Sequence, residues 1–237
     1  MLKYEIKEKL RTSDYDMYDR VKIHSLFDIF QDVAGDHAAM LNIGYENLKK
    51  KNLIWVLRSQ YIRIKGNIPY NEEITLRTWP KVRGRADFIR YYEIETTCGD
   101  IVCEGISKWV VINYETRKID RASDINYNGE LYSKTLFDDY DRIRTNIPHT
   151  KEFIESYRVR NDDLDHNGHM NNAIYPKIIY NMVKLSKNFR IRGMQIDYLH
   201  EALLDDKIDV YYFNENENKY FVGYVNLEEV FIARVEE

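Results

Sequence analysis

The sequence predicts an α+β protein made of two similar units, each a long helix wrapped by an antiparallel β-sheet. Three observations support this prediction. The order of one strand, one long helix and four strands occurs twice within the 237 residues. Residues 71–76 align with 205–210, and residues 62–63 with 196–197, both at an offset of 134 positions. The chain also contains 20 tyrosines and only four prolines, a composition that suits regular strands with one buried face.

The first unit is expected to begin with an alternating strand at 4–8 and to continue in a helix at about 25–41. Apolar residues recur in this helix every three or four positions, on a stripe wide enough to be buried on most sides. Gly44 is a natural stop, and 45–51 is expected to form a short polar helix. Strand-like runs then follow at 55–64, 74–79, 88–97 and 101–113.

The second unit is expected to repeat this order, with a strand at 153–159 and a helix at about 172–187. Asn171 or Asn172 would cap the helix, and Pro176 is tolerated only near its first turn. The remaining strands are expected at 194–199, 208–213, 220–227 and 230–235.

A segment without periodicity, 126–150, is predicted to link the two units, which makes the domains 1–125 and 151–237. One buried helix wrapped by an antiparallel sheet is a hotdog unit. The chain is therefore predicted to be a tandem (double) hotdog.

A dense polar stretch, 160–172, joins the strand of the second unit to its helix. Asp165, Asn167 and His169 occupy alternate positions there. In an extended segment residues two apart face the same side, so we expect the acid, the amide and the imidazole to share one surface. The first unit offers only Asp19 and Arg20 at the corresponding place, which favours one active site per chain.

Two other interpretations of this stretch remain open. Asp, Asn and Gly commonly build well-capped turns that have no chemical role. Asp165, His166 and His169 could instead bind a metal ion, but no further His or Cys cluster completes a ligand set. We therefore expect neither a metal nor a cofactor, and we leave His166 outside the candidate site.

The composition limits the range of partners. A net charge of −4 does not suit a nucleic-acid binder. Residues 49–90 nevertheless carry eleven basic and three acidic side chains, a local excess of +8 that could attract an acidic partner or be balanced within the fold. Two cysteines, Cys98 and Cys103, are too few for a disulfide framework. No apolar run is long enough to span a membrane and the first residues lack a signal-type core, so we expect a cytoplasmic protein.

The polar stretch and the first half both resemble one family. The run LDHNGHMNNAIY (164–175) is similar to the motif of acyl-acyl-carrier-protein (acyl-ACP) thioesterases. QDVA (31–34), TW (78–79), GR (84–85) and SKWVVIN (107–113) followed by Thr116-Arg117 are similar to the first hotdog of that family. The tandem length favours this branch over the single-hotdog acyl-coenzyme A thioesterases, which share the shorter motif.

The resemblance implies site residues. It places the catalytic Asp, Asn and His of the family on Asp165, Asn167 and His169, and a catalytic Glu on Glu201, at the end of the strand after the helix. Glu201 could also be a charged strand end without a role. In plant members a Cys follows this Glu, but Ala202 stands here, which excludes a cysteine nucleophile at this place.

The chemistry of thioester hydrolysis suits these residue types. Glu201 or Asp165 could activate water or attack directly, and His169 could move the proton. Asn167 and backbone N–H groups near Asn171 could bind the oxyanion. An acidic, phosphopantetheine-bearing acyl carrier protein would suit the basic side chains of Lys81, Arg83, Arg85 and Arg90.

We therefore expect an enzyme that hydrolyses acyl-ACP to free fatty acid and carrier protein, ending fatty acid synthesis. The first unit would supply the acyl pocket and the second the catalytic residues. A homodimer is expected, because hotdog edges usually pair. Two alternatives are an acyl-coenzyme A thioesterase of hotdog type and a non-catalytic acyl-binding regulator. The regulator would carry a helix-turn-helix and a damaged catalytic turn, and the sequence has neither.

Overall fold

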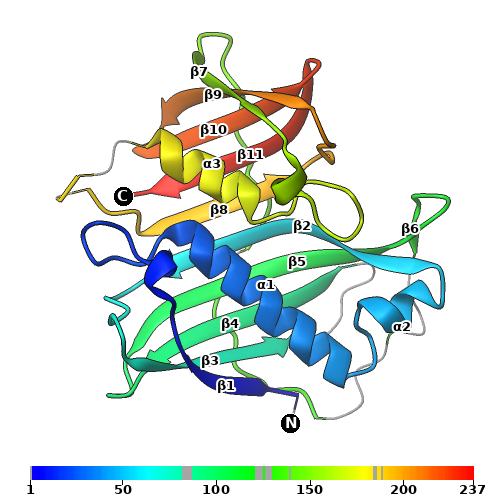
Figure 1. Ribbon diagram of the computed structural model, residues 1–237, viewed down its shortest axis with the longest axis vertical. Coiled ribbons are helices and arrows are strands. Elements are labelled where there is room, and N and C mark those ends of the chain that lie inside the picture. The colour runs from blue at the N-terminus through cyan, green and yellow to red at the C-terminus, as the bar shows by residue number, and fades with distance from the viewer. Residues whose placement is uncertain are drawn as a thin grey trace.

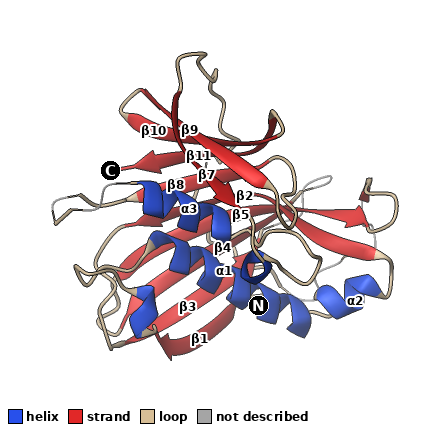
Figure 2. Cartoon of the chain, turned by 45° about the horizontal axis from the view of Figure 1, so that its top comes forward, coloured by secondary structure: helices blue, strands red, loops and turns tan. Residues whose placement is uncertain are grey.

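The computed structural model describes residues 2–81, 87–120, 125, 130–138, 140–183, 186–187 and 189–237. These residues form one continuous antiparallel sheet of eleven strands, with the two longer helices on the same face (Figures 1 and 2). The strand order is β1-β3-β4-β5-β2-β8-β11-β10-β9-β7, and β6 pairs with β5. No helix within the described ranges is long and apolar enough to cross a membrane.

The first unit follows the predicted order closely. Its elements are β1 (Tyr4–Lys9), a 3₁₀ turn (Thr12–Asp14), α1 (Ile23–Met40), α2 (Tyr45–Lys49), β2 (Leu53–Ile64), β3 (Glu73–Pro80), β4 (Phe88–Thr96), β5 (Ile101–Asn113) and β6 (Ile119–Asp120). Phe30 of α1 stacks on Tyr92 of β4, with ring centroids 4.6 Å apart. A Cβ at Gly105 of β5 would lie 2.5 Å from the Phe30 ring, so glycine is what lets α1 approach the sheet this closely.

The second unit consists of β7 (Glu152–Arg158), a 3₁₀ turn (Asn161–Asp163), α3 (Ile174–Met182), β8 (Gly193–Tyr198), β9 (Lys207–Glu215), β10 (Asn218–Val225) and β11 (Glu228–Glu236). Its helix is shorter than the predicted 172–187. Asn171 accepts the Ala173 N–H on its side chain (3.0 Å) and the Ile174 N–H on its backbone carbonyl (2.9 Å), which delays the helix start. At the other end Val183 is extended, with ψ 135°.

The two units join through β2 and β8. These strands pair antiparallel in a register centred on Tyr61 and Gln195, flanked by Gln60 with Ile196 and Ile62 with Met194. Tyr61 and Gln195 are 134 positions apart, the offset found in the sequence. The pairing is therefore pseudo-symmetric, and each unit contributes its equivalent strand to the junction.

The segment after β6 lies against the face of the sheet that is turned away from the helices. Residues 130–138 and 140–150 contain no helix or strand in the described positions. Tyr132, Leu136, Phe137 and Tyr140 pack on a cluster around Trp79, and Ile143 and Ile147 pack on a cluster in the second unit. The part of the predicted linker at 126–129 lies outside the described residues.

Candidate active site

The polar stretch 160–172 is a closed turn and not the extended segment that the sequence suggested. Leu164 and Met170 pair as an antiparallel bridge. Between them the Asp165 N–H donates to the carbonyl of His169 (2.8 Å), and the Gly168 N–H donates to the carbonyl of Asp165 (3.0 Å). Gly168 has φ 77°, a left-handed conformation that glycine adopts without cost. Closure of the turn brings the polar side chains together.

Asp165 holds this turn through its carboxylate. Oδ1 accepts the N–H groups of Asn167 (2.8 Å) and His169 (3.2 Å), while Oδ2 accepts the side-chain amide of Asn167 (3.3 Å). The other amide atom, Asn167 Oδ1, is buried and has no hydrogen-bond partner within the described part of the chain. An unsatisfied buried polar atom costs about 1–3 kcal/mol, and such atoms call for an explanation such as a missing ligand or water.

His169 lies next to Glu201. Its Nε2 lies 3.3 Å from Glu201 Oε2. The segment that carries Glu201 follows β8 and is fixed to the turn by the Met170 N–H, which donates to the Ala202 carbonyl (2.8 Å), and by a bridge between His169 and Leu203. The structure thus brings Glu201 to the turn, where only the family resemblance had placed it.

Arg117 is a further member of the site that the sequence did not single out. It lies in the turn between β5 and β6 of the first unit, and its Nη2 pairs with Glu201 Oε1. The two residues are 84 positions apart, and no local pattern links them. Arg117 belongs to a segment that resembles the family, but the resemblance gave it no role.

Two cavities meet at the turn. The smaller, of about 350 Å³, is lined by His169, Glu201 and Arg117. The larger, of about 1010 Å³, runs between α1, α2 and the first sheet. Both are lined by Trp55, Asp165, Asn167 and Asn172. The space arises because β2 pairs with β8 only over Ser59–Arg63, so the first half of β2 leaves a gap beside the turn.

Two tyrosines line the smaller cavity, and His166 lines the larger one. Tyr175 and Tyr198 line the smaller one, with rings 5.4 Å apart, and the Tyr198 hydroxyl donates to the Asn172 carbonyl (3.0 Å). Burial raises the pKa of both hydroxyls well above the ordinary value, so both remain protonated. His166 lines the larger cavity, with its ring 6.2 Å from that of Tyr45, and does not join His169.

The four residues expected to meet a carrier protein are not equivalent. Arg83 and Arg85 lie outside the described residues. Lys81 follows β3 and donates its N–H to the Ile89 carbonyl (2.8 Å). Arg90 is only 7% exposed, and its guanidinium lies 2.9 Å from His37 Nδ1. Arg90 therefore belongs to the wall of the larger cavity and not to the outer surface that was expected to meet a partner.

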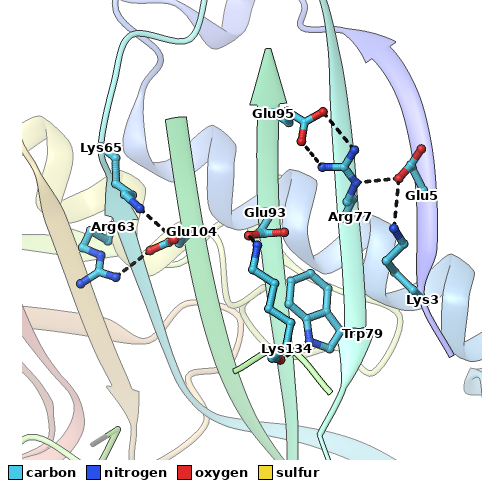
Figure 3. Close-up of polar contacts among 10 residues, drawn as sticks. All are labelled: Lys3, Glu5, Arg63, Lys65, Arg77, Trp79, Glu93, Glu95, Glu104 and Lys134. Atoms are coloured by element: carbon cyan, nitrogen blue, oxygen red, sulfur yellow. Dashed lines mark hydrogen bonds and ion pairs between the residues drawn. The ribbon is translucent and has the colours of Figure 1, made fainter. Parts of the chain in front are cut away.

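Much of the remaining basic stretch is neutralised inside the fold. Figure 3 shows Arg63 and Lys65 both reaching Glu104 from the same side, at 2.6 and 3.0 Å, and Arg77 between Glu5 and Glu95. The same face carries the ion pair between Lys134 and the buried Glu93. For these residues the charge excess is balanced across strands of the sheet.

Comparisons with known proteins agree with this architecture. Models of the acyl-ACP thioesterase N-terminal and C-terminal domains match residues 1–128 and 146–230. The chain is 22% identical to oleoyl-acyl carrier protein thioesterase 1, chloroplastic, of Arabidopsis thaliana, over 88% of this chain and 63% of that one. A Coriandrum sativum oleoyl-acyl carrier protein thioesterase is also 22% identical, over 88% and 62%. The chain thus spans less than two thirds of these relatives.

Solved structures show the same fold. An acyl-ACP thioesterase from Bacteroides thetaiotaomicron superposes with a TM-score of 0.85 at 21% identity, covering 98% of this chain and 96% of that one. A 12:0-ACP thioesterase from Umbellularia californica gives 0.86 at 18% identity, covering 100% and 97%. The predicted tandem hotdog is confirmed. Because the two domain models together match most of the sequence, this protein belongs to the acyl-ACP thioesterase family.

Proposed function

We propose that this protein hydrolyses acyl-ACP thioesters, releasing free fatty acid and carrier protein at the end of fatty acid synthesis. The observation that carries the proposal is the meeting of Asp165, Asn167, His169 and Glu201 at one cavity, beside a second cavity of about 1010 Å³. A polar site that opens into a large adjoining space suits a substrate with a reactive head and a long apolar tail.

The larger cavity is the proposed acyl pocket, and it belongs mainly to the first unit. Its apolar wall includes Ile43, Trp55, Phe88 and Trp109, whose burial against a hydrocarbon chain would favour binding. The second unit supplies the four proposed catalytic residues. The thioester would lie where the two cavities meet, and the pantetheine arm would enter through the smaller one.

In the proposed reaction Glu201 orients His169 through Nε2, which favours the tautomer with Nδ1 as the proton acceptor. His169 takes a proton from water as the water oxygen attacks the thioester carbonyl. The side-chain amide of Asn167 donates to the oxyanion. The C–S bond then breaks, and the imidazolium returns its proton to the leaving thiolate. The N–H groups of Ala173 and Ile174 are already bonded to Asn171, whereas the Asn167 amide has a second N–H beside the one that Asp165 accepts. The oxyanion role is therefore assigned to Asn167.

Asp165 could instead attack the carbonyl itself and form an anhydride that water then opens. A single turnover in oxygen-18 water tests the covalent route. Attack by water places the label in the fatty acid alone, whereas label recovered in the carboxylate of Asp165 would exclude the direct-water route.

The function is tested by thiol release from a series of acyl-ACP substrates of different chain length, with Asp165→Ala as the control. We expect turnover by the wild type and loss of it in the variant. The same acyl groups on coenzyme A separate the alternatives. Equal or better turnover of the coenzyme A esters would favour an acyl-coenzyme A thioesterase, and acyl binding without turnover would favour a regulator.

Docking of the acidic carrier is proposed at Lys81, Arg83 and Arg85. Support comes from the charge of this segment, which carries three basic side chains within five residues. Charge reversal at Arg83 and Arg85 should raise KM for carrier-bound substrate more than for the coenzyme A ester. Equal effects on both substrates would count against docking there.

We also propose that two copies associate and that the enzyme works in the cytoplasm. Within the described sheet, β2 and β8 are paired inside the chain, and the outer strands β1 and β7 offer edges for a second copy. Light scattering of the purified protein should give twice the mass of the chain. A monomer would contradict the first proposal, and recovery in a membrane or exported fraction would contradict the second.

A further inference from the structure

The turn that carries Arg117 is held by its own hydrogen bonds. Asn113 Oδ1 accepts the N–H groups of Glu115 (3.1 Å) and Thr116 (2.9 Å), and the Asn113 carbonyl accepts the N–H of Arg117 (2.9 Å). Arg117 has φ 57°, a left-handed conformation that is uncommon for a non-glycine residue. Its side chain is thereby directed from the first unit into the smaller cavity.

Arg117, Glu201 and His169 form a row of three groups from three separate segments. Arg117 pairs with Oε1 of Glu201, and Oε2 of the same carboxylate lies 3.3 Å from His169 Nε2. Within the described part of the chain, no other Lys or Arg pairs with Glu201. The neighbouring His200 faces Glu228 instead, at 3.3 Å. One carboxylate thus joins a cation of the first unit to the imidazole of the second.

This ion pair is poorly placed to stabilise the fold. Both side chains are 40% exposed, and exposed pairs contribute little because water screens them and ordering two long side chains costs entropy. It is well placed to select one rotamer of Glu201. A half-exposed Glu without a fixed partner samples several rotamers, and only some of them direct an oxygen at His169.

We propose that Arg117 is a positioning residue, which fixes the Glu201 carboxylate so that its second oxygen orients His169. The inference rests on the proposed function, since it assigns Arg117 a part in that same site. It also makes the active site a joint product of the two units. The second unit alone would have the turn and the acid, but not the cation that holds the acid in place.

The test compares Arg117→Ala with Lys118→Ala, an adjacent exposed basic residue of the same turn. Loss of orientation of a catalytic group by about 1 Å can cost about 100-fold in rate. We expect Arg117→Ala to lower kcat about 10- to 100-fold with KM within about twofold. Arg117→Lys should recover part of kcat, and Lys118→Ala should resemble the wild type.

A double-mutant cycle identifies the route of the effect. If Arg117 acts through Glu201, then adding Arg117→Ala to Glu201→Ala should lower kcat no further. Independent, multiplicative losses would overturn the proposal. So would an increase in KM with unchanged kcat, which would mean that Arg117 binds the substrate, or a result equal to that of Lys118→Ala.

A crystal structure of Arg117→Ala gives a readout that does not depend on turnover. We expect Glu201 to leave His169, and an unchanged contact between them would contradict the proposal. Failure of the proposed function is distinguishable. In that case the wild type would hydrolyse no acyl thioester, or Asp165→Ala would be as active as the wild type, whatever Arg117→Ala does to the position of Glu201.

Discussion

The turns that lead into α1 and α3 share one pattern of backbone hydrogen bonds, but the aspartate of each turn has a different side chain beside it. Asp16 in the first turn takes the place of Asp165, 149 positions later. Its Oδ1 accepts two backbone N–H groups, from Tyr18 (2.8 Å) and Arg20 (3.0 Å), as Asp165 does in the second turn. The left-handed residue is Asp19 in the first turn (φ 57°) and a glycine in the second. The two units therefore share the scaffold of the site.

The difference lies in what the carboxylate meets. Arg20 stands in the place of His169 and pairs with Asp16 at 2.7 Å, with side chains 15% and 6% exposed. Arg20 also donates to the backbone carbonyls of Ser186 and Phe189 in the second unit. The cavity beside this turn is only about 70 Å³. In the first unit the acid is thus part of a brace between the units, whereas in the second it faces an open cavity.

The largest expected difference between the turns is in activity. Asp165→Asn should lower kcat about 100-fold, because Asp165 holds the turn that places Asn167 and His169 and a misplacement of about 1 Å can cost that much, whereas Asp16→Asn should leave kcat near that of the wild type. Single-turnover rates on one acyl-ACP substrate would measure both, with circular dichroism to show that each variant is folded. An equal loss in Asp16→Asn would mean that the first turn also takes part in the reaction.

Stability should show the reverse order. Arg20→Ala leaves the nearly buried carboxylate of Asp16 without its cation, which should cost about 3 kcal/mol of unfolding free energy. His169→Ala removes a side chain whose acidic partner is 40% exposed and should cost less than about 1 kcal/mol. Urea unfolding at pH 7 gives both values. Similar losses in the two variants would contradict the assignment of a bracing role to Arg20 alone.

The comparison also shows where reasoning from the sequence went wrong. The sequence alone favours Asp19 as the counterpart of Asp165, because both come shortly before the long helix, whereas in the structure Asp16 makes the contacts that Asp165 makes. The signal was present, because each turn contains Asp, an apolar residue and a second Asp, at 14–16 and 163–165. Matching the polar residues nearest to the helix gave a shift of three positions, because it ignored the apolar residue that the bridge requires.

The order of elements was predictable because helix and strand periodicities are local, and so was the grouping of Asp165, Asn167 and His169. Arg90 was also within reach. In β4 it lies two positions from Phe88 and from Tyr92, on the face that packs inward. The place of Arg117 in the site was not predictable from the sequence, because its contact with Glu201 exists only after the two halves of the sheet have joined.

The residue after the first turn provides a pH-dependent contrast. His24 packs edge-on against Tyr180, with rings 5.1 Å apart, and burial lowers its pKa from 6.5 to about 4. The corresponding residue of the second unit is Ala173, which does not titrate. Below pH 6.5 the unfolded chain binds a proton at His24 that the folded chain refuses, so stability falls as the pH decreases from 6.5 to 4.

His24→Phe keeps the ring contact and removes the titration. Between pH 7 and pH 4.5 the wild type should therefore lose about 2 kcal/mol more than the variant. Urea unfolding at the two pH values measures this difference. Part of the dependence should remain, because burial also lowers the pKa of His37 to about 4. Equal pH dependence in both proteins would show that His24 is not protected from protonation by the fold.

The smallest expected effect concerns the caps. Asn171 accepts the Ala173 N–H on its side chain, whereas Lys22, 149 positions earlier, makes no side-chain cap at the start of α1. Lys22→Asn should place an acceptor at the same point and raise stability by about 0.5 kcal/mol, part of the gain being offset by loss of the bond from Lys22 Nζ to the Ser13 carbonyl. Asn171→Ala should cost about 1 kcal/mol.

Thermal unfolding of these two variants tests how far the turns are interchangeable. A gain at position 22 and a loss at position 171 would show that the two backbones present the helix start in the same way. The bracing turn of the first unit would then differ from the catalytic turn of the second only in the side chains at the positions of Asn167 and His169. If Lys22→Asn were destabilising, the first turn would have to differ in its backbone as well. The small size of the cavity beside the first turn would then have a cause besides the pairing of Asp16 with Arg20.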